Sequence, residues 1–337
     1  MLTIMAFTVC VGAHADQGKT VRIIEDNKPA MGSTLKIQVA VFPGEDAEAS
    51  RQAIDKAFKE ADRVENMLSA SKEGSEVSRI NSQGPGRPTQ VSSEIFSLIA
   101  WSIQNNQNTR GAFDIAVGPL TDLWREAGNN KRLPSNSQID EAVGAIGSQY
   151  IMLDTATNGL LFAKKGMRID FGDIAKGYAV SRVVKALKDC GVNNALVGLG
   201  GYMYCLGMAD DKDMWRVGIP HPKDKNKVFA SLRLKDRAIC TSACYGNYFV
   251  IKGKRYSYMV DPRTGYPVNN GVVSATVVAD DPVNAGMMSM VLCVLGNDGL
   301  QAADSVGSDA LIIMEEKGKL KLGLAGGFKE QYGKARK

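Results

Sequence analysis

The stretch that decides the fold of this chain is Ile169-Asp170-Phe171-Gly172-Asp173-Ile174-Ala175-Lys176-Gly177-Tyr178. It has the pattern of a strand end, a glycine turn and a helix start. The first turn of a helix carries unpaired N–H groups and the positive end of the helix dipole, which together attract phosphate groups. Lys176 adds a positive charge there, and Asp170 adds a carboxylate that accepts hydrogen bonds or faces a metal. The stretch therefore predicts an anion-binding helix start, although glycine turns of this kind also occur without a ligand.

Hydrophobic periodicity predicts the elements on either side of this stretch. Helices are expected over residues 45–68, from Ser92 or Ser93 onward, over 120–126, over 135–146, from the opening stretch to about 189, and over 282–295. Strands are expected over 34–42, 150–153, 159–163, 215–219, 228–234, 248–252, 273–279 and 310–314. Residues 69–90 are expected to form a loop, and residues 195–207 a single strand with Gly200 and Gly201 inside it.

The order of these elements predicts an α+β fold, because strand-like and helical runs are partly separated rather than alternating. The 337 residues include 44% hydrophobic and 23% charged residues, which is an ordinary globular composition. We expect one integrated domain over residues 16–337, with mixed or antiparallel sheets layered with helices. The net charge is only +5 and the basic residues are scattered, so no nucleic-acid partner is expected.

The N-terminal segment predicts export. Residues 1–12 are mostly apolar, and Ala13-His14-Ala15 before Asp16 matches a signal-peptide cleavage site, with cleavage after Ala15. A periplasmic or otherwise exported protein would follow, although a buried N-terminal strand is the alternative. No later run is long and apolar enough to predict a transmembrane segment.

The few cysteines and histidines limit which catalytic and metal sites are expected. Cys240 and Cys244 are the only closely spaced cysteines, which could form a disulfide or a metal contact, but buried free thiols are the preferred interpretation. The two histidines are His14, in the predicted signal segment, and His221, in a polar loop. A catalytic triad is therefore not expected unless His221 supplies it, and acid–base steps fall to carboxylate, lysine or tyrosine side chains.

Six short segments then occur in a characteristic order. They are Met31-Gly32-Ser33, Gly111-Ala112-Phe113-Asp114-Ile115-Ala116-Val117-Gly118-Pro119-Leu120, residues 170–177, Leu199-Gly200-Gly201, Thr241-Ser242 and Asp261-Pro262-Arg263-Thr264-Gly265. Each is weak alone. Together they resemble the FAD:protein FMN transferase family, the ApbE-type flavin transferases, over nearly all of the chain after the N-terminal segment.

The resemblance implies an exported enzyme with a flavin-transferase-type domain. Such an enzyme splits FAD in the presence of Mg²⁺, transfers FMN to a Thr or Ser of an acceptor flavoprotein and releases AMP. Lys176 would help to stabilise the charge that develops on the pyrophosphate. The resemblance implies that the FAD site is lined by Met31, Ala112, Phe113, Asp114, Asp170, Lys176 and Met259.

The chain departs from the family at the expected catalytic base. Tyr258 stands where the resemblance implies a histidine that acts on the acceptor hydroxyl. A phenol holds its proton at neutral pH and is therefore a poor base. Ser71 also stands where an aromatic residue is usual, and Ala243-Cys244 replace a Gly-Asp pair.

The chain also departs from the family at the expected Mg²⁺ ligands. Gly286 and Met290 stand where the resemblance implies a metal-binding Asp and Thr, and Tyr202 stands where Asp or Asn is usual. Mg²⁺ requires hard oxygen ligands, which a thioether does not supply. Asp173 offers a carboxylate that either replaces a lost ligand or simply suits the start of the helix, and the second interpretation is preferred. Asp280, Asp281 and Ser289 are further alternatives.

These departures leave three functions open. The first is a flavin transferase with an altered metal site and base. The second is a catalytically degenerate exported protein that binds FAD without transferring FMN. The third is an FAD pyrophosphatase, which hydrolyses FAD rather than transferring FMN and which would also need a metal.

Overall fold

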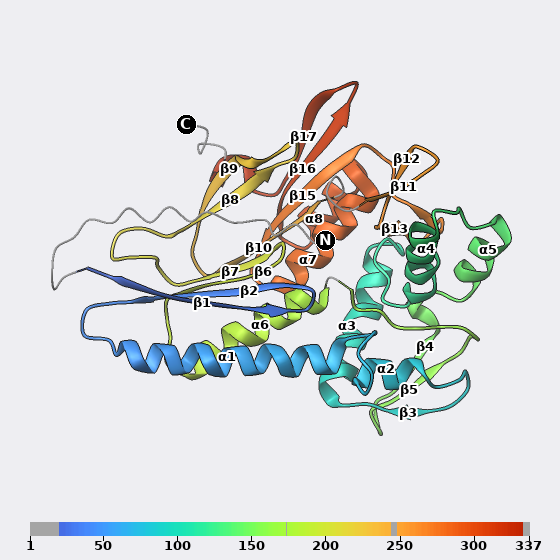
Figure 1. The fold of residues 1–337 in the computed structure, drawn as a ribbon, viewed down its shortest axis with the longest axis horizontal. Helices are drawn as coiled ribbons and strands as arrows, with labels where there is room; N and C mark the ends of the chain where they lie inside the picture. Colours follow the sequence, from blue (N-terminus) through green and yellow to red (C-terminus); the bar gives the residue numbers. More distant parts are fainter. Residues whose placement is uncertain (1–19, 173, 244–247, 333–337) are drawn as a thin grey trace.

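The computed structural model describes residues 20–172, 174–243 and 248–332. An eight-stranded sheet forms the centre of the protein (Figure 1). All neighbouring strands in it are antiparallel. In spatial order they are β1 (Arg22–Ala30), β2 (Ser33–Val41), β6 (Ala195–Leu199), β7 (Tyr202–Leu206), β10 (Arg237–Ala243), β15 (Val272–Ala279), β16 (Asp309–Glu316) and β17 (Lys319–Ala325).

Smaller sheets and the helices surround this centre. The smaller sheets are β3 (Thr89–Gln90), β5 (Gly159–Phe162) and β4 (Ile151–Asp154); β8 (Trp215–His221) and β9 (Asp224–Leu234); β11 (Tyr248–Ile251) and β12 (Lys254–Ser257); and β13 (Val260–Asp261) and β14 (Tyr266–Pro267). The helices are α1 (Ala47–Leu68), α2 (Glu76–Asn81), α3 (Ser93–Asn108), α4 (Gly118–Asn130), α5 (Asn136–Gly144), α6 (Ile174–Asp189), α7 (Pro282–Leu295), α8 (Leu300–Ser305) and α9 (Phe328–Tyr332), with single 3-10 turns η1 (Ser148–Tyr150) and η2 (Gly296–Gly299).

The central sheet separates two cores. Helices α6 and α7 pack on one face, with α1 against α6, while the β8–β9 sheet covers the other face (Figure 1). Successive side chains of a strand point to opposite faces. Tyr202 and Tyr204 of β7 therefore face the helices, whereas Met203 and Cys205 face Trp215 of β8. This alternation fixes which residues of β7 can reach α6 and α7.

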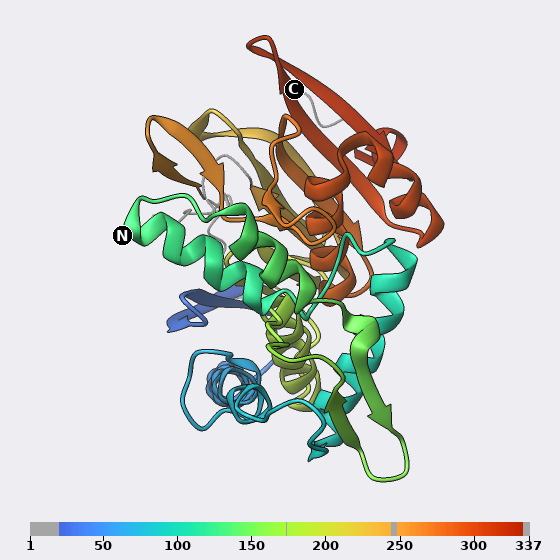
Figure 2. The same ribbon diagram turned by 90° about the vertical axis from the view of Figure 1, so that its right-hand side faces the viewer.

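A third core lies in a small lobe formed by α4, α5 and the β11–β12 hairpin, which Figure 2 shows from the front. Trp124 is its centre, stacked on Tyr256 with ring centroids 6.1 Å apart. The indole Nε1–H of Trp124 donates to the carbonyl oxygen of Gly265 at 2.8 Å. This bond joins the Asp261-to-Gly265 turn to the helices of the lobe.

The predicted α+β class with layered antiparallel sheets is confirmed. The helix predicted over residues 282–295 begins and ends at those residues, because Asp281 caps it and Pro282 occupies its first turn. The single strand predicted over 195–207 is wrong: Gly200, with φ +61°, and Gly201 form a turn between β6 and β7. The loop predicted over 69–90 is also corrected, because it contains α2 and β3.

Two further observations concern the described residues. None of the helices in these ranges is both long and apolar enough to cross a membrane. Cys205, Cys240 and Cys293 are buried and form no disulfide, as expected, whereas Cys190 is half-buried; burial raises the pKa of Cys205. Cys244 and the predicted signal segment lie outside the described residues.

Candidate functional site

The start of α6 follows a tightly bonded turn. The backbone N–H of Asp170 donates to the carbonyl oxygen of Ile115 at 2.8 Å, and the carboxylate of Asp170 accepts from the N–H of Gly172 at 2.8 Å. Lys176 lies in the first turn of the helix and is half-buried. Asp173 lies outside the described residues, so its predicted role as a metal ligand or helix-start residue stays a prediction. These two hydrogen bonds of Asp170 hold the turn that precedes the helix.

The β6–β7 turn and the β1–β2 hairpin meet the start of α6. A Cβ built on Gly200 would lie 3.4 Å from Ser33 Oγ and 3.7 Å from Lys176 Cδ. Gly201 contacts β10 even more closely: the N–H of Thr241 donates to its carbonyl oxygen at 3.0 Å, and a Cβ there would lie 2.5 Å from Thr241 O. Segments distant in the sequence thus place the hydroxyl of Ser33, the side chain of Lys176 and the Gly200-Gly201 turn close together.

Met31 occupies the hairpin turn next to Ser33. Its φ is +49° and that of Gly32 is +69°, so both central residues of the turn are left-handed. A methionine in this region is uncommon. The N–H of Met31 donates to Glu65 Oε2 of α1 at 3.0 Å, which holds the turn, and the half-buried side chain packs at the edge of the main core.

The segment 112–114 lies deeper than expected for residues that line a binding site. Ala112 and Phe113 are buried, and the Phe113 ring meets Trp101 edge-on with centroids 5.9 Å apart. The carboxylate of Asp114 accepts from Ala116 N at 2.7 Å, from Ser148 N at 3.1 Å and from Ser148 Oγ. Burial raises the pKa of Asp114 despite these bonds. The carboxylate of Asp114 therefore holds the loop before α4 against η1.

Met259 and Tyr258 lie between the β11–β12 hairpin and β13. Met259 is half-buried against the main core, and its carbonyl oxygen accepts from Val268 N at 2.9 Å. Tyr258 is 43% exposed and its ring meets Phe249 edge-on at 5.1 Å. The phenol is therefore accessible to an approaching molecule.

The start of α7 faces α6 across a single aromatic ring. Tyr202 is 4% exposed, and a Cβ built on Gly286 would lie 2.2 Å from its Cε1 and 2.4 Å from its Oη. A Cβ on Gly177 of α6 would lie 2.8 Å from the same Cε1 and 2.8 Å from Pro282 O. The Tyr202 ring therefore fills the space between the two helices. Sequence patterns did not predict this contact; an interior helix glycine together with a large residue after Gly200-Gly201 is the signal that could have found it.

We call the contact of Tyr202 with Gly177 of α6 and Gly286 of α7 the α6–α7 joint. The side chains around it do not fit Mg²⁺. Met290 is a thioether, and Ser289 Oγ already bonds Ser242 Oγ at 2.7 Å and Gly286 O at 2.8 Å. Asp281 caps α7, accepting from Val283 N at 2.8 Å and Asn284 N at 3.0 Å. Asp280 is exposed and pairs with Arg237 at 3.3 Å. No group of three or more Asp, Glu, His or Cys residues within 20–172, 174–243 and 248–332 could hold a metal ion.

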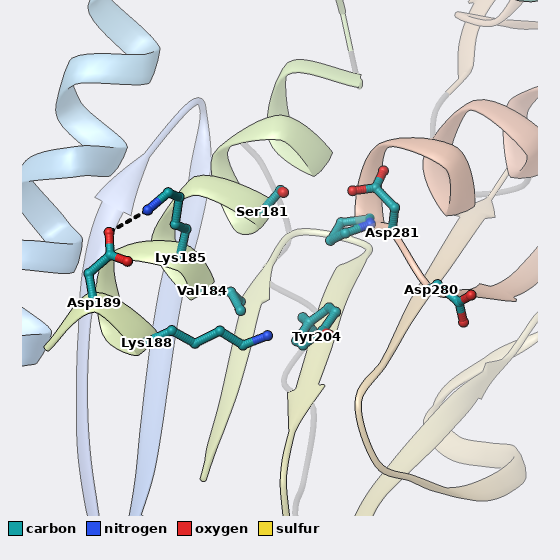
Figure 3. A pocket seen from close by; sticks show the side chains of 9 residues that line it. Ser181, Val184, Lys185, Lys188, Asp189, Tyr204, Asp280 and Asp281 are labelled. Carbon is teal, nitrogen blue, oxygen red and sulfur yellow. Dashed lines mark hydrogen bonds and ion pairs between the residues drawn. The ribbon is translucent and has the colours of Figure 1, made fainter. Parts of the chain in front are cut away.

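A separate pocket of about 290 Å³ lies along the second half of α6 (Figure 3). Lys185 of its lining pairs with Asp189 at 2.6 Å, and Lys188 Nζ lies 5.8 Å from the centroid of the Tyr204 ring. Burial, followed by the charge of Asp236, raises the pKa of Tyr204. Asp280 and Asp281, named above as alternative metal ligands, line this pocket, whereas Lys176 and the other residues of the predicted FAD site do not.

The ApbE family model matches residues 31–312. An FAD:protein FMN transferase of Vibrio cholerae is 31% identical over 292 residues, which are 85% of this chain and 86% of that protein. The FAD:protein FMN transferase of Escherichia coli K12 is 30% identical over 289 residues, which are 80% of this chain and 82% of the relative.

Solved structures show the same relationship. The apo crystal structure of the Pseudomonas stutzeri flavinyl transferase ApbE matches with a TM-score of 0.83 and 28% identity, covering 93% of this chain and 98% of that one. The ApbE protein of Thermotoga maritima matches with a TM-score of 0.83 and 30% identity, covering 92% and 99%. Sequence, fold and the order of the site segments agree: this chain belongs to the ApbE family of flavin transferases.

Proposed function

We propose that this chain binds FAD at the start of α6 and acts on it as an FAD:protein FMN transferase. The observation that carries the proposal is the meeting of Ser33, Gly200 and Lys176, which come from three segments far apart in the sequence. The N–H groups of a helix start and a lysine ammonium suit the pyrophosphate of FAD. Relatives with this name share about 30% of the sequence over most of the chain.

In the proposed reaction, the hydroxyl oxygen of a Ser or Thr on an acceptor flavoprotein attacks the phosphorus of the FMN half of FAD. A new P–O bond forms, the P–O bond to AMP breaks, and AMP leaves with the electron pair of that bond. Lys176 stabilises the negative charge that develops on the pyrophosphate oxygens. A water molecule takes the hydroxyl proton. No step is assigned to Mg²⁺, because the residues at the α6–α7 joint do not fit it.

The test is direct transfer of a fluorescent group. The purified chain, FAD, Mg²⁺ and an acceptor flavoprotein are incubated, and the acceptor is examined for flavin fluorescence on a denaturing gel. We expect a fluorescent acceptor with the wild type and a weaker band with Lys176→Ala. An unlabelled acceptor, in a reaction where the Vibrio cholerae relative labels it, would contradict transfer.

A second candidate function is FAD binding without transfer. The tight contact of Tyr202 with Gly286 favours it, because both positions depart from the pattern of the family, as does Tyr258. In that case FAD binds, as followed by quenching of flavin fluorescence, while the acceptor stays unlabelled. Tyr258→His then tests whether the missing base alone limits transfer.

We also propose that residues 1–15 form a signal peptide and that the mature chain is exported, as the apolar run and the Ala13-His14-Ala15 site suggest. Mass spectrometry of the protein from a fractionated host tests this. We expect a periplasmic protein that begins at Asp16. An uncleaved chain in the cytoplasmic fraction would contradict export.

A further inference from the structure

We propose that the Tyr202 ring takes the place of a divalent cation between α6 and α7, so that this chain binds FAD without such a cation. The inference rests on the FAD binding proposed above and is independent of whether FMN is transferred. Three residues of the joint carry it, which are Tyr202, Gly286 and Ser289.

The first step is the fit between Tyr202 and Gly286. The ring is buried, and a Cβ on Gly286 would overlap its Cε1, Oη and Cζ atoms at 2.2, 2.4 and 2.6 Å. Real Cβ atoms do not approach other atoms so closely, so the ring and any longer side chain at 286 exclude each other. A carboxylate cannot enter this joint at position 286 while Tyr202 keeps its place.

The second step concerns the oxygen atoms that remain. Ser289 is fully buried, and its hydroxyl bonds Ser242 Oγ and Gly286 O at 2.7 and 2.8 Å. These oxygens therefore satisfy one another, and a cation would have to break their bonds. Mg²⁺ loses its water shell reluctantly and is usually held through carboxylates, which these groups do not provide. Asp281, the acidic residue that opens α7, is committed to the helix cap.

The negative charge of the FAD pyrophosphate needs a cationic group in place of the metal ion. Lys176 lies in the first turn of α6, at the positive end of the helix dipole, and a Cβ built on Gly200 would lie 3.7 Å from its Cδ. A lysine and a helix start can bind a pyrophosphate without a metal ion. We therefore assign charge neutralisation to α6, and we assign mechanical support of that helix to the Tyr202 ring.

The experiment measures cation and nucleotide binding separately. FAD is titrated into the full chain in excess Mg²⁺ and in excess EDTA, with free FAD in both buffers as the control. Mn²⁺ is then titrated into the protein without FAD and followed by electron paramagnetic resonance. We expect the Kd for FAD to differ by less than about twofold between the buffers, and no stoichiometric Mn²⁺ binding.

Three results would overturn parts of this assignment, and they can be told apart. Tightening of FAD binding by about tenfold or more in Mg²⁺ overturns cation independence. One-to-one Mn²⁺ binding by the wild type overturns the role of the ring. Absence of FAD binding in both buffers overturns the proposed FAD site, whereas the Mn²⁺ titration still decides whether the joint admits a cation.

A matched pair of variants tests the ring itself. Tyr202→Asn with Gly286→Asp and Met290→Thr removes the ring and supplies oxygen ligands, and we expect it to bind Mn²⁺. Gly286→Asp with Met290→Thr keeps the ring, and we expect it to bind no Mn²⁺ and to have a lower Tm than the wild type. Equal Mn²⁺ binding by the two variants contradicts the proposal. If the triple variant does not fold, the wild-type titrations still decide the question.

Discussion

The starts of α6 and α7 lie side by side on one face of the central sheet, yet they are built differently. The start of α6 meets the Gly200-Gly201 turn, the hydroxyl of Ser33 and the side chain of Lys176. The start of α7 meets the Tyr202 ring, and its acidic cap is committed to backbone N–H groups. Lys176 and the helix dipole make the start of α6 suited to an anion. The packing of the Tyr202 ring makes the start of α7 a structural contact.

The largest expected effect breaks the joint at α7. Gly286→Ala should gain about 1 kcal/mol from helix propensity but lose more, because its methyl group would overlap the buried Tyr202 ring. We expect a net loss of about 2–3 kcal/mol in the free energy of unfolding, the range of core overpacking. Urea unfolding followed by circular dichroism measures it.

Tyr202→Leu provides the control for this prediction, because leucine lacks the ring atoms that the new methyl group would meet. In the Tyr202→Leu background, Gly286→Ala should cost nothing or stabilise. Gly177→Ala should remain destabilising in the same background, since its methyl group would still lie 2.8 Å from Pro282 O. A Gly286→Ala penalty of equal size in both backgrounds would mean that the ring is not the obstacle.

The sequence predicted the α6 side of this comparison better than the α7 side. The helix after the opening stretch and the helix over 282–295 are confirmed, because caps and apolar periodicity are local signals, whereas no strand ends at Ile169 or Asp170 as the opening stretch predicted. The β6–β7 hairpin was missed because a two-residue turn keeps the apolar pattern of β6 and β7 unbroken across Gly200 and Gly201. Helix α2 was missed because its six residues are too few to show the apolar periodicity of a helix.

The candidate site shows the same limit. Sequence order indicated which segments belong together, and the structure brings Ser33, Gly200 and Lys176 into one place. The sequence could not show that Asp114 bonds Ser148, or that Tyr202 excludes a side chain at Gly286. Both contacts join residues far apart in the chain, and their geometry depends on how the helices pack on the sheet.

The second prediction tests the α6 side. Lys176→Ala should weaken FAD binding about tenfold, or about 1.4 kcal/mol, because a charge beside the pyrophosphate is lost. Fluorescence titration measures the Kd. Lys185→Ala on the same helix is the control, since Lys185 is exposed and pairs with Asp189 in the separate pocket. Equal weakening by the two variants would place the nucleotide elsewhere on α6.

The third prediction separates stability from ligand binding at the start of α7. Asp281→Ala removes the cap that accepts from Val283 N and Asn284 N, and should lower the free energy of unfolding by about 1 kcal/mol. FAD affinity should stay within about twofold of the wild type, because this carboxylate serves the helix rather than the ligand. Asp281→Asn should retain most of the stability. A large loss of FAD affinity with Asp281→Asn would instead make this carboxylate part of the ligand site.

The smallest effect concerns how α6 is anchored to α1 and α3. Arg63 bonds Glu60 and Glu94 at 2.8 Å each, Arg182 of α6 donates to Glu60 at 2.9 Å, and Tyr178 donates to Glu94. Hydrogen bonds from Arg63 hold the pKa of both glutamates below the ordinary value of 4.5. The start of α7 instead contacts α6 through the Tyr202 ring. This contact contains no group that takes up a proton in acid.

Because these two carboxyls have a lower pKa in the folded chain than in the unfolded chain, the network stabilises the fold above pH 4.5. That contribution is lost as the pH falls through the lowered folded values. Arg63→Gln should therefore destabilise by under about 1 kcal/mol at neutral pH, with a difference from the wild type that shrinks on acidification. Urea unfolding at a series of pH values measures both. A difference that grows in acid would contradict the assigned sign and leave packing, not charge, as the anchor of α6.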